Sequence, residues 1–253
     1  GNPDLALVQN LGPKFSAAAV FTTNRCQANP VIWSKEVIKD GQLVAAVLNS
    51  GGANCYTGAQ GFQTTHQTAE RVAERLSCGA GDVLVCSTGL IGELLPMEKI
   101  LNGIDALVPA LTGDSLETVA RSIMTTDSVP KIAQTQVSGA SFVGVAKGAG
   151  MLAPALATML SVVMTDAILP ENAQEIFSRV ADRTYNRIDS DGCTSTNDTV
   201  LLMGSGASDV SLSESDLELA LTFICASLAE QLIADAEGST KSVAITVNGA
   251  ASE

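Results

Sequence analysis

The chain has 253 residues, a formal net charge of −13 at pH 7, and 46% hydrophobic but only 4% aromatic residues. This length allows one large domain or two smaller ones with a full hydrophobic core, and so acidic a surface argues against nucleic-acid binding because it repels phosphate backbones. One histidine, and cysteines with no C-x-x-C pair among them, argue against a zinc site.

Apolar runs in the first half of the chain predict short strands at 5–8, 17–21, 43–48 and 82–86. Residues 10–13 predict a turn between the first two strands, and 32–38 is compatible with either a helix or a strand. Apolar side chains recur at helical spacing before the fourth strand and predict a helix over 65–76. His66 lies near the start of this helix, where a lone histidine is usually solvated or capping, and we assign it no chemistry.

The second half of the chain mixes helices and strands. Asp114 and Glu117 have the spacing of a capping box, which predicts a helix from there to about Ile123. Residues 134–146 predict extended chain with a turn at Gly139. Further strands are predicted at 159–167, 200–203 and 242–247, and helices at 170–188 and 213–236, the second with Gly238 as its left-handed cap. Helices and strands do not alternate strictly, so the pattern favours a layered α+β fold over a doubly wound parallel sheet.

Two predicted strands run directly into loops of glycine and small polar residues. Asn49–Asn54 follows the third strand and matches no phosphate-loop pattern, so it either brings backbone N–H groups to a ligand or simply turns the chain. Ser87–Gly92 follows the fourth strand. There, the hydroxyl of Thr88 and the N–H of Gly89 suit the stabilisation of an oxyanion, although Thr-Gly also occurs in ordinary turns.

The stretch from Lys147 to Leu160 contains two glycines and a proline between two apolar runs. Glycine and proline hold a chain in a tight, irregular path, and a threonine such as Thr158, placed just after that path, is suited to lie close to a reacting backbone. Composition alone favours a plain loop between two strands. The stretch is therefore informative only through its specific sequence.

That sequence closely resembles the self-cleavage segment of the ornithine acetyltransferases (glutamate N-acetyltransferases) of arginine biosynthesis. Further strings resemble the same family in the same order, namely Asn49–Asn54, Cys86–Gly92, Ile123–Asp127, Ser195–Thr199 and Asp235–Gly238. Several long strings in register make chance similarity very improbable. The resemblance covers essentially the whole chain.

Members of this family cut their own precursor at an Ala-Thr bond, and the new N-terminal threonine is the nucleophile. The resemblance therefore implies cleavage between Ala157 and Thr158, with Thr158 as the catalytic nucleophile. Residues 1–157 would be the α-chain portion, and 158–253 would be the N-terminal part of the β-chain. Because members usually carry further residues at both ends, we expect this chain to lack the family's C-terminal remainder.

The resemblance also implies the remaining site residues and the fold. The oxyanion hole would be formed by Thr88 and Gly89, and substrate would be bound by Thr125, Lys147, Thr158 and Glu237. No metal and no cofactor are implied. The implied fold is a layered α/β/β/α sandwich, similar in appearance to the N-terminal-nucleophile hydrolases but differently connected.

The implied reaction transfers the acetyl group of N2-acetyl-L-ornithine to L-glutamate through an acetyl-threonine intermediate. Some members also take acetyl-coenzyme A as a donor. The resemblance further implies a cytoplasmic heterotetramer of two α and two β chains. No signal peptide opens the chain, and no uninterrupted apolar run reaches the length of a membrane span, so we expect a soluble protein with reduced thiols and no membrane partner.

Two other functions fit the same residues. An N-terminal-nucleophile amidase or aminopeptidase of similar architecture would pass the acyl group to water instead of glutamate. An inactive fragment or uncut precursor would only bind amino acids or partner chains. An assay of acetyl transfer to glutamate against simple deacetylation separates the acetyltransferase from the amidase. An intact bond between Ala157 and Thr158 without activity would support the inactive fragment or precursor.

Overall fold

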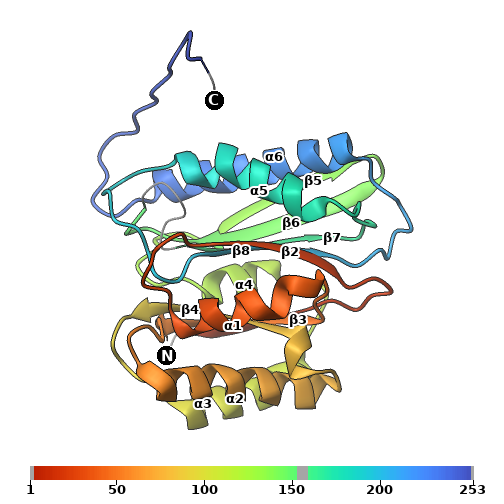
Figure 1. Ribbon diagram of the computed structural model, residues 1–253, viewed down its shortest axis with the longest axis vertical. Coiled ribbons are helices and arrows are strands. Elements are labelled where there is room, and N and C mark those ends of the chain that lie inside the picture. Colours follow the sequence, from red (N-terminus) through yellow and green to blue (C-terminus); the bar gives the residue numbers. More distant parts are fainter. Residues whose placement is uncertain (1–2, 153–158, 252–253) are drawn as a thin grey trace.

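Two β-sheets face each other at the centre of the molecule, and helices cover their outer faces (Figure 1). The computed structural model describes residues 3–152 and 159–251. This arrangement confirms the α/β/β/α sandwich that the resemblance implied. Self-cleavage at residues 157 and 158, and the division of the chain there, fall outside the described residues.

The smaller sheet has the order β1 (Leu5–Gln9), β3 (Ala45–Gly52) and β4 (Val83–Leu90). The larger sheet has the order β2 (Ser16–Phe21), β8 (Thr199–Gly204), β7 (Leu160–Thr165), β6 (Ala140–Lys147) and β5 (Lys131–Val137). The helices are α1 (Asn29–Val37), α2 (Gly58–Leu76), α3 (Met97–Leu107), α4 (Leu116–Ser122), α5 (Ala173–Arg183) and α6 (Glu214–Ala234). Short 3₁₀ turns are η1 (Ile38–Asp40), η2 (Ala80–Asp82), η3 (Val108–Ala110) and η4 (Tyr185–Arg187).

The β3–β4 and β7–β8 pairs are parallel, and the other neighbouring strands are antiparallel. The first two strands, β1 and β2, are consecutive in the chain but do not form a hairpin, because they lie in different sheets. β1 pairs with β3 in one sheet and β2 pairs with β8 in the other, so residues 10–13 carry the chain from one layer to the next.

Apolar side chains fill the three spaces between the four layers. Between the sheets, Leu84 of β4 lies in one buried cluster with Val162 and Leu201 of the larger sheet. The other face of the larger sheet is covered by α5 and α6, and that of the smaller sheet by α2 and α3. Each fully buried Leu or Val side chain contributes roughly 1.5–3 kcal/mol, so these clusters are the main source of stability.

The longest helix, α6, has 21 residues and is long and apolar enough by composition alone to cross a membrane. Its inner face, however, is buried in the cluster over the larger sheet. The buried residues recur at helical spacing and include Leu217, Leu221, Ile224, Leu228 and Leu232. This burial is typical of a core helix in a layered protein.

The ambiguous segment at 32–38 belongs to α1, which lies along the open edge of β4. Trp33 Nε1 donates to the carbonyl of Val83 at 3.1 Å. Ser34 Oγ donates to the carbonyl of Val85 at 2.8 Å and accepts its N–H at 3.1 Å. The helix therefore satisfies backbone groups that an uncovered edge strand would leave unpaired.

Several predicted elements begin or end elsewhere because side chains far from the hydrophobic pattern decide the boundary. The helix predicted at 65–76 begins at Gly58. Asn54 Nδ2 donates to the carbonyl of Gly61 at 2.9 Å, and Thr57 Oγ1 donates to Asn54 Oδ1 at 2.7 Å. These bonds support a first turn that its glycines would otherwise disfavour.

The capping box predicted at Asp114 and Glu117 is wrong. The residue before α4 is Ser115, and it makes no side-chain cap bond. Glu117 instead accepts two hydrogen bonds from Arg121 one turn later, at 3.0 and 2.7 Å. An (i, i+4) ion pair has replaced the reciprocal cap.

The helix predicted at 170–188 is also shorter, because the chain leaves the helical conformation at Thr184. The hydroxyl of Thr184 bonds back to the carbonyl of Val180 at 2.7 Å, and η4 follows. The other predicted strands of the larger sheet, and its turn at Gly139, are confirmed.

The strand predicted at 242–247 is wrong, and so is the cap at Gly238. No strand among the described residues pairs with 242–247, and its apolar side chains are exposed, at 78% for Val243 and 87% for Ile245. The segment runs out from the body of the molecule (Figure 1). Gly238 has a left-handed φ of 73°, but α6 has already ended, with Asp235 as its cap.

Ser34→Ala tests the edge contact of α1. The substitution leaves the buried N–H and C=O of Val85 without their partner, so we expect the free energy of unfolding to fall by about 1–3 kcal/mol, measured by urea denaturation. Ser215→Ala, on the exposed first turn of α6, is the matched control and should change it by less than about 0.5 kcal/mol. Equal effects of the two substitutions would contradict this role of Ser34.

Candidate active site

The two glycine-containing loops predicted from the sequence are neighbouring strand ends. β3 and β4 stay paired beyond the predicted strands, with Ser50 opposite Thr88 and Gly51 opposite Gly89. Gly89 has a φ of 121°, and a Cβ there would lie 2.5 Å from the carbonyl carbon of Gly51. Only glycine allows the two backbones to approach this closely, so Gly89 has a steric reason for its identity apart from any catalytic one.

Lys147 reaches this strand end from the opposite sheet. It is the last residue of β6, it is 1% exposed, and its Nζ donates to Thr125 Oγ1 at 2.7 Å and to Thr88 Oγ1 at 3.1 Å. Because Lys147 supplies the proton in that bond, the hydroxyl proton of Thr88 is left to point elsewhere, and it donates to no other described residue. Thr88 can therefore act as a donor into the cleft.

Burial lowers the pKa of Lys147 to about 8, while the negative charge of Asp127 opposes this shift and the positive charge of Lys131 adds to it. Asp127 Oδ2 lies 3.9 Å from Lys147 Nζ. At neutral pH Lys147 is mostly protonated. It supplies a desolvated positive charge, which is suited to a carboxylate ligand.

Glu237 approaches the same place from beyond the end of α6. Its N–H donates to the carbonyl of Ala149 at 2.6 Å, and its Oε2 lies 3.3 Å from where a Cβ on Gly150 would stand. A larger residue than glycine at 150 would press on this carboxylate. The exposed Glu237 therefore stands at the rim of the cleft, over the backbone that leads into residues 153–158.

The cleft has a volume of about 630 Å³ and is lined by Gly51, Thr88, Gly89, Leu90, Met124, Thr125, Thr126, Lys147, Gly150, Met151 and Glu237. All the described residues that the resemblance placed in the site are among them. They come from β4, the loop after α4, the end of β6 and the chain beyond α6. Ala157 and Thr158, the predicted cleavage pair and nucleophile, lie outside the described residues.

The chain on both sides of residues 153–158 is held by one segment, 190–198. Before them, the N–H of Met151 donates to Asp191 Oδ2 at 2.7 Å, and the carbonyl of Leu152 accepts the N–H of Ser190 at 2.5 Å. After them, the N–H of Met159 donates to Asp198 Oδ1 at 2.9 Å. The polar string before β8 thus anchors both flanks of the predicted cleavage segment.

Asp198 is a residue to which the sequence analysis gave no role, although it lies in one of the motif strings. Its side chain is 0% exposed, and its Oδ2 has no hydrogen-bond partner among the described residues. Burial raises the pKa of Asp198 well above its usual range, although the Met159 N–H and the charge of Lys147 favour the ionised form. A buried carboxyl group with a raised pKa therefore lies beside the flank of the predicted cleavage segment.

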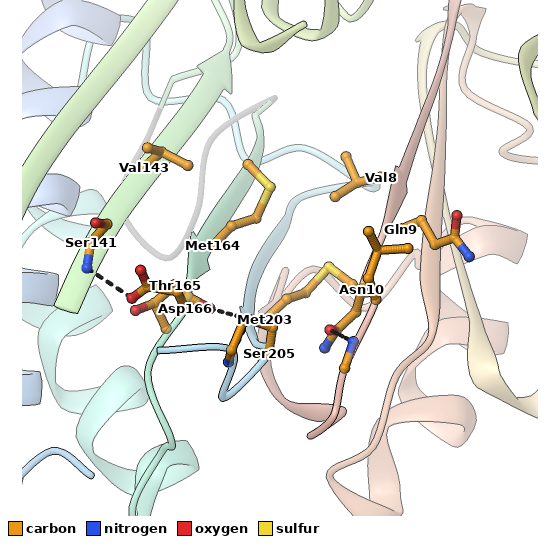
Figure 2. A pocket seen from close by; sticks show the side chains of 13 residues that line it. Val8, Gln9, Asn10, Ser141, Val143, Met164, Thr165, Asp166, Met203 and Ser205 are labelled. Carbon is orange, nitrogen blue, oxygen red and sulfur yellow. Dashed lines mark hydrogen bonds between the residues drawn. The ribbon is translucent and has the colours of Figure 1, made fainter. Parts of the chain in front are cut away.

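A second cavity lies at the other end of the larger sheet, where β6 begins and β7 and β8 end (Figure 2). Its volume is about 370 Å³, and Val8, Val143 and Met164 make its walls mainly apolar. Asp166 is the only ionisable side chain among the described residues that line it, and its Oδ1 already accepts the N–H of Ser141 at 2.9 Å. Such a lining offers little to a charged substrate, so the cleft at Lys147 is the candidate active site.

The ArgJ family model matches residues 1–253 of this chain. A relative from Streptomyces avermitilis, the arginine biosynthesis bifunctional protein ArgJ, is 54% identical over 254 residues, which cover 100% of this chain and 66% of that protein. The chain thus spans about two thirds of the length of the curated relatives that it matches.

Solved structures with a similar fold include a crystal structure of ornithine acetyltransferase from Mycobacterium tuberculosis complexed with ornithine. It is 47% identical, with a TM-score of 0.54, and the match covers 60% of this chain and 82% of that chain. A β-aminopeptidase from a Burkholderia species has a TM-score of 0.54 over 93% of this chain and 78% of its own, at 13% identity. This second likeness is one of fold alone.

Asp198→Asn tests the raised pKa of the buried carboxyl. A carboxyl with a raised pKa must release its proton on unfolding above pH about 3.9, the reference value, so wild-type stability falls as pH rises from there towards the folded pKa. Asparagine removes this loss. We expect the free energy of unfolding of the variant, relative to that of the wild type, to increase by up to about 1.4 kcal/mol per pH unit in that range. The measurement is urea denaturation from pH 5 to 8.

The exposed Asp4→Asn is the matched control and should show no such gain. A stability difference between the variant and the wild type that stays constant from pH 5 to 8 would mean that Asp198 is ionised in the folded protein throughout that range.

Proposed function

Because the chain belongs to the ArgJ family, we propose that it carries the acetyl-transfer site of an ornithine acetyltransferase, which moves the acetyl group of N2-acetyl-L-ornithine to L-glutamate. The observation that carries the proposal is the meeting of the predicted site residues in one cleft, Thr88, Gly89, Thr125, Lys147 and Glu237. These residues are far apart in the sequence. Their assembly supplies hydroxyl and backbone donors, a buried cation and a carboxylate within reach of one substrate.

Self-cleavage comes first in this proposal. The hydroxyl oxygen of Thr158 attacks the carbonyl carbon of Ala157, the bond from that carbon to the nitrogen of Thr158 breaks, and the nitrogen takes up a proton. The resulting ester is hydrolysed by water, which leaves residue 157 as a carboxylate and Thr158 as a free N-terminus. The oxyanion formed in each step is stabilised by the donors of Thr88 and Gly89, at a worth of about 3–4 kcal/mol for one donor.

The free α-amino group of Thr158 then serves as the general base for its own hydroxyl. The reference pKa of such an amine is about 7.7–8.0, so it is poised near neutral pH. No histidine is needed. His66, the only histidine of the chain, packs against Trp33 with ring centroids 4.8 Å apart and is not among the described residues that line the cleft.

Acetyl transfer follows two half-reactions. Thr158 oxygen attacks the acetyl carbonyl of N-acetylornithine, the amide bond breaks, and ornithine leaves with its amine protonated. The amine of glutamate then attacks the acetyl-threonine ester and releases the Thr158 hydroxyl. The bond from Lys147 to Thr88 Oγ1 supports this chemistry, because it leaves the Thr88 proton for the oxyanion.

Substrate recognition rests on charges at two ends of the cleft. The ammonium group of Lys147, with the hydroxyl of Thr125, would bind the α-carboxylate of the amino-acid substrate. Glu237 at the rim would meet the cationic end of ornithine. The ammonium group of Lys147 is held by its bonds to Thr88 and Thr125, and the backbone of Glu237 is held by its bond to Ala149.

The wider properties of the family complete the proposal. We expect the mature protein to be a cytoplasmic heterotetramer of two α and two β chains, divided between residues 157 and 158. We also expect the site to need no cofactor. Acetyl-coenzyme A is the second acetyl donor to assay, because some members of the family use it. The amidase hypothesis is supported by the fold of the Burkholderia β-aminopeptidase, but a likeness of fold at 13% identity does not favour it over acetyl transfer.

Thr158→Ala tests the nucleophile and the cleavage together. The variant lacks the attacking hydroxyl, so we expect a single uncut chain by denaturing mass spectrometry and no detectable N-acetylglutamate from N-acetylornithine and glutamate. The wild type should give two chains, one beginning at Thr158, together with transfer. Thr158→Ser retains a hydroxyl and should retain part of both activities.

The exposed Thr118→Ala is the matched control and should behave as the wild type. Two chains and full transfer in Thr158→Ala would refute the assignment. Release of acetate with no transfer to glutamate by the wild type would favour the amidase.

Lys147 should also make substrate affinity depend on pH. Its charged form is lost as the pH rises through about 8, so the KM for N-acetylornithine should rise above that pH. In Lys147→Met the KM should be about ten- to hundredfold higher at pH 7 and should lose this dependence, because a hydrogen bond to a charged group is removed. An unchanged midpoint in the variant would assign the dependence to another group.

A further inference from the structure

Two lysines lie inside the protein beside the cleft. Lys131, the first residue of β5, is 0% exposed, and Lys147 is 1% exposed. An ammonium group is tolerated inside a protein only when carboxylates and hydrogen bonds replace its water. Lys147 belongs to the proposed substrate site, whereas the sequence analysis and the proposed function give Lys131 no role.

Lys131 bridges two aspartates from distant parts of the chain. Its Nζ donates to Asp127 Oδ1 at 2.7 Å and to Asp235 Oδ2 at 2.6 Å. Asp127 also accepts the backbone N–H of Thr125 at 3.1 Å and that of Gly148 at 2.6 Å. Both aspartates occur in the motif strings, so this contact explains residues that the proposed chemistry leaves unused.

Each of these contacts fixes a residue of the cleft or its immediate neighbour. Thr125 lines the cleft directly, and Gly148 follows Lys147 in the chain. Asp235 lies two residues before Glu237, and it also accepts the N–H of Ser128 at 3.0 Å. The cluster therefore ties the loop after α4, the end of β6 and the end of α6 to one another.

We propose that Lys131 is a positioning residue, which holds Thr125, Lys147 and Glu237 in their substrate-binding arrangement and prevents Asp127 from capturing Lys147. The proposal rests on the proposed function, because it takes the cleft to bind an amino-acid substrate. Lys131 itself touches no substrate in this scheme. It acts through the two aspartates.

The charges around Lys147 support this role. The groups that act on its charge are Asp127, Lys131 and Asp198, and Glu237 shares the cleft with it. Asp127 Oδ2 lies 3.9 Å from Lys147 Nζ, a distance longer than a hydrogen bond. Without Lys131, this buried carboxylate would have Lys147 as its nearest cation, and the ammonium group would be drawn away from Thr88 and Thr125.

Lys131→Met keeps the length of the side chain and removes its charge. We expect ornithine, titrated calorimetrically into the purified protein, to bind about ten- to hundredfold more weakly than to the wild type. We also expect the pH at which binding is lost to move upward, because the positive charge of Lys131 lowers the pKa of Lys147. A residue with a merely structural role would not move this midpoint. The exposed Lys39→Met is the matched control and should leave both quantities unchanged.

Asp235→Asn provides a second variant if Lys131→Met does not fold. Asparagine keeps the shape and an acceptor oxygen, and Lys131 retains Asp127, so the fold should be kept while the tie to α6 is weakened. We expect the affinity for ornithine to fall by about three- to tenfold, as one charge-assisted hydrogen bond is replaced by a neutral one.

The positioning role would be overturned if Lys131→Met bound ornithine with wild-type affinity and lost binding at the wild-type pH. Unchanged affinity for ornithine in a folded Asp235→Asn would also overturn it. Acetyl transfer by the wild type is measured in parallel. A wild type that binds ornithine but transfers no acetyl group would refute the proposed reaction while the binding data still decide the role of Lys131. A wild type that binds no ornithine would overturn both proposals.

Discussion

One buried ammonium group joins the two sheets at the cleft. Lys147 stands at the end of β6 in the larger sheet, and its bonds to Thr88 and Thr125 reach the smaller sheet and the loop after α4. Removing such a charge from water is costly, so the surroundings must supply carboxylates and fixed donors. The neighbouring ion cluster meets this need, and for that reason the geometry of the cleft depends on residues that do not line it.

The backbone around Lys147 is constrained in two further ways. Glycine at 89 lets β4 approach β3 more closely than any residue with a Cβ would allow, which brings the Thr88 hydroxyl and the Gly89 backbone to the same strand end. The segment 190–198 binds the chain on both sides of residues 153–158. These contacts hold the backbone around the cleft in place, which favours chemistry that needs a donor and an acceptor positioned before reaction.

Local patterns predicted most of the fold. The β5–β6 pair around Gly139, the buried face of α6 and the strands of the larger sheet follow from spacing and turn residues, which act within a few positions. The failures lie where distant contacts decide. Segment 32–38 is a helix because it covers the edge of β4, and 242–247 is not a strand because no described strand pairs with it. The capping box predicted at Asp114 and Glu117 does not form, because the carboxylate of Glu117 bonds to Arg121 instead.

The sequence by itself determined the family, because specific strings such as Cys86–Gly92 and Lys147–Leu160 carry it. It also predicted Thr88, Gly89, Thr125, Lys147 and Glu237 as site residues, and these five line one cleft. The same sequence predicted the layered α+β class, because helices and strands do not alternate strictly along the chain. Only the tertiary structure decided which charges surround Lys147. Lys131 meets Asp235 across 104 positions of the chain, and burial raises the pKa of Asp198. Neither fact can be read from spacing, because desolvation and long-range pairing exist only once the layers have packed.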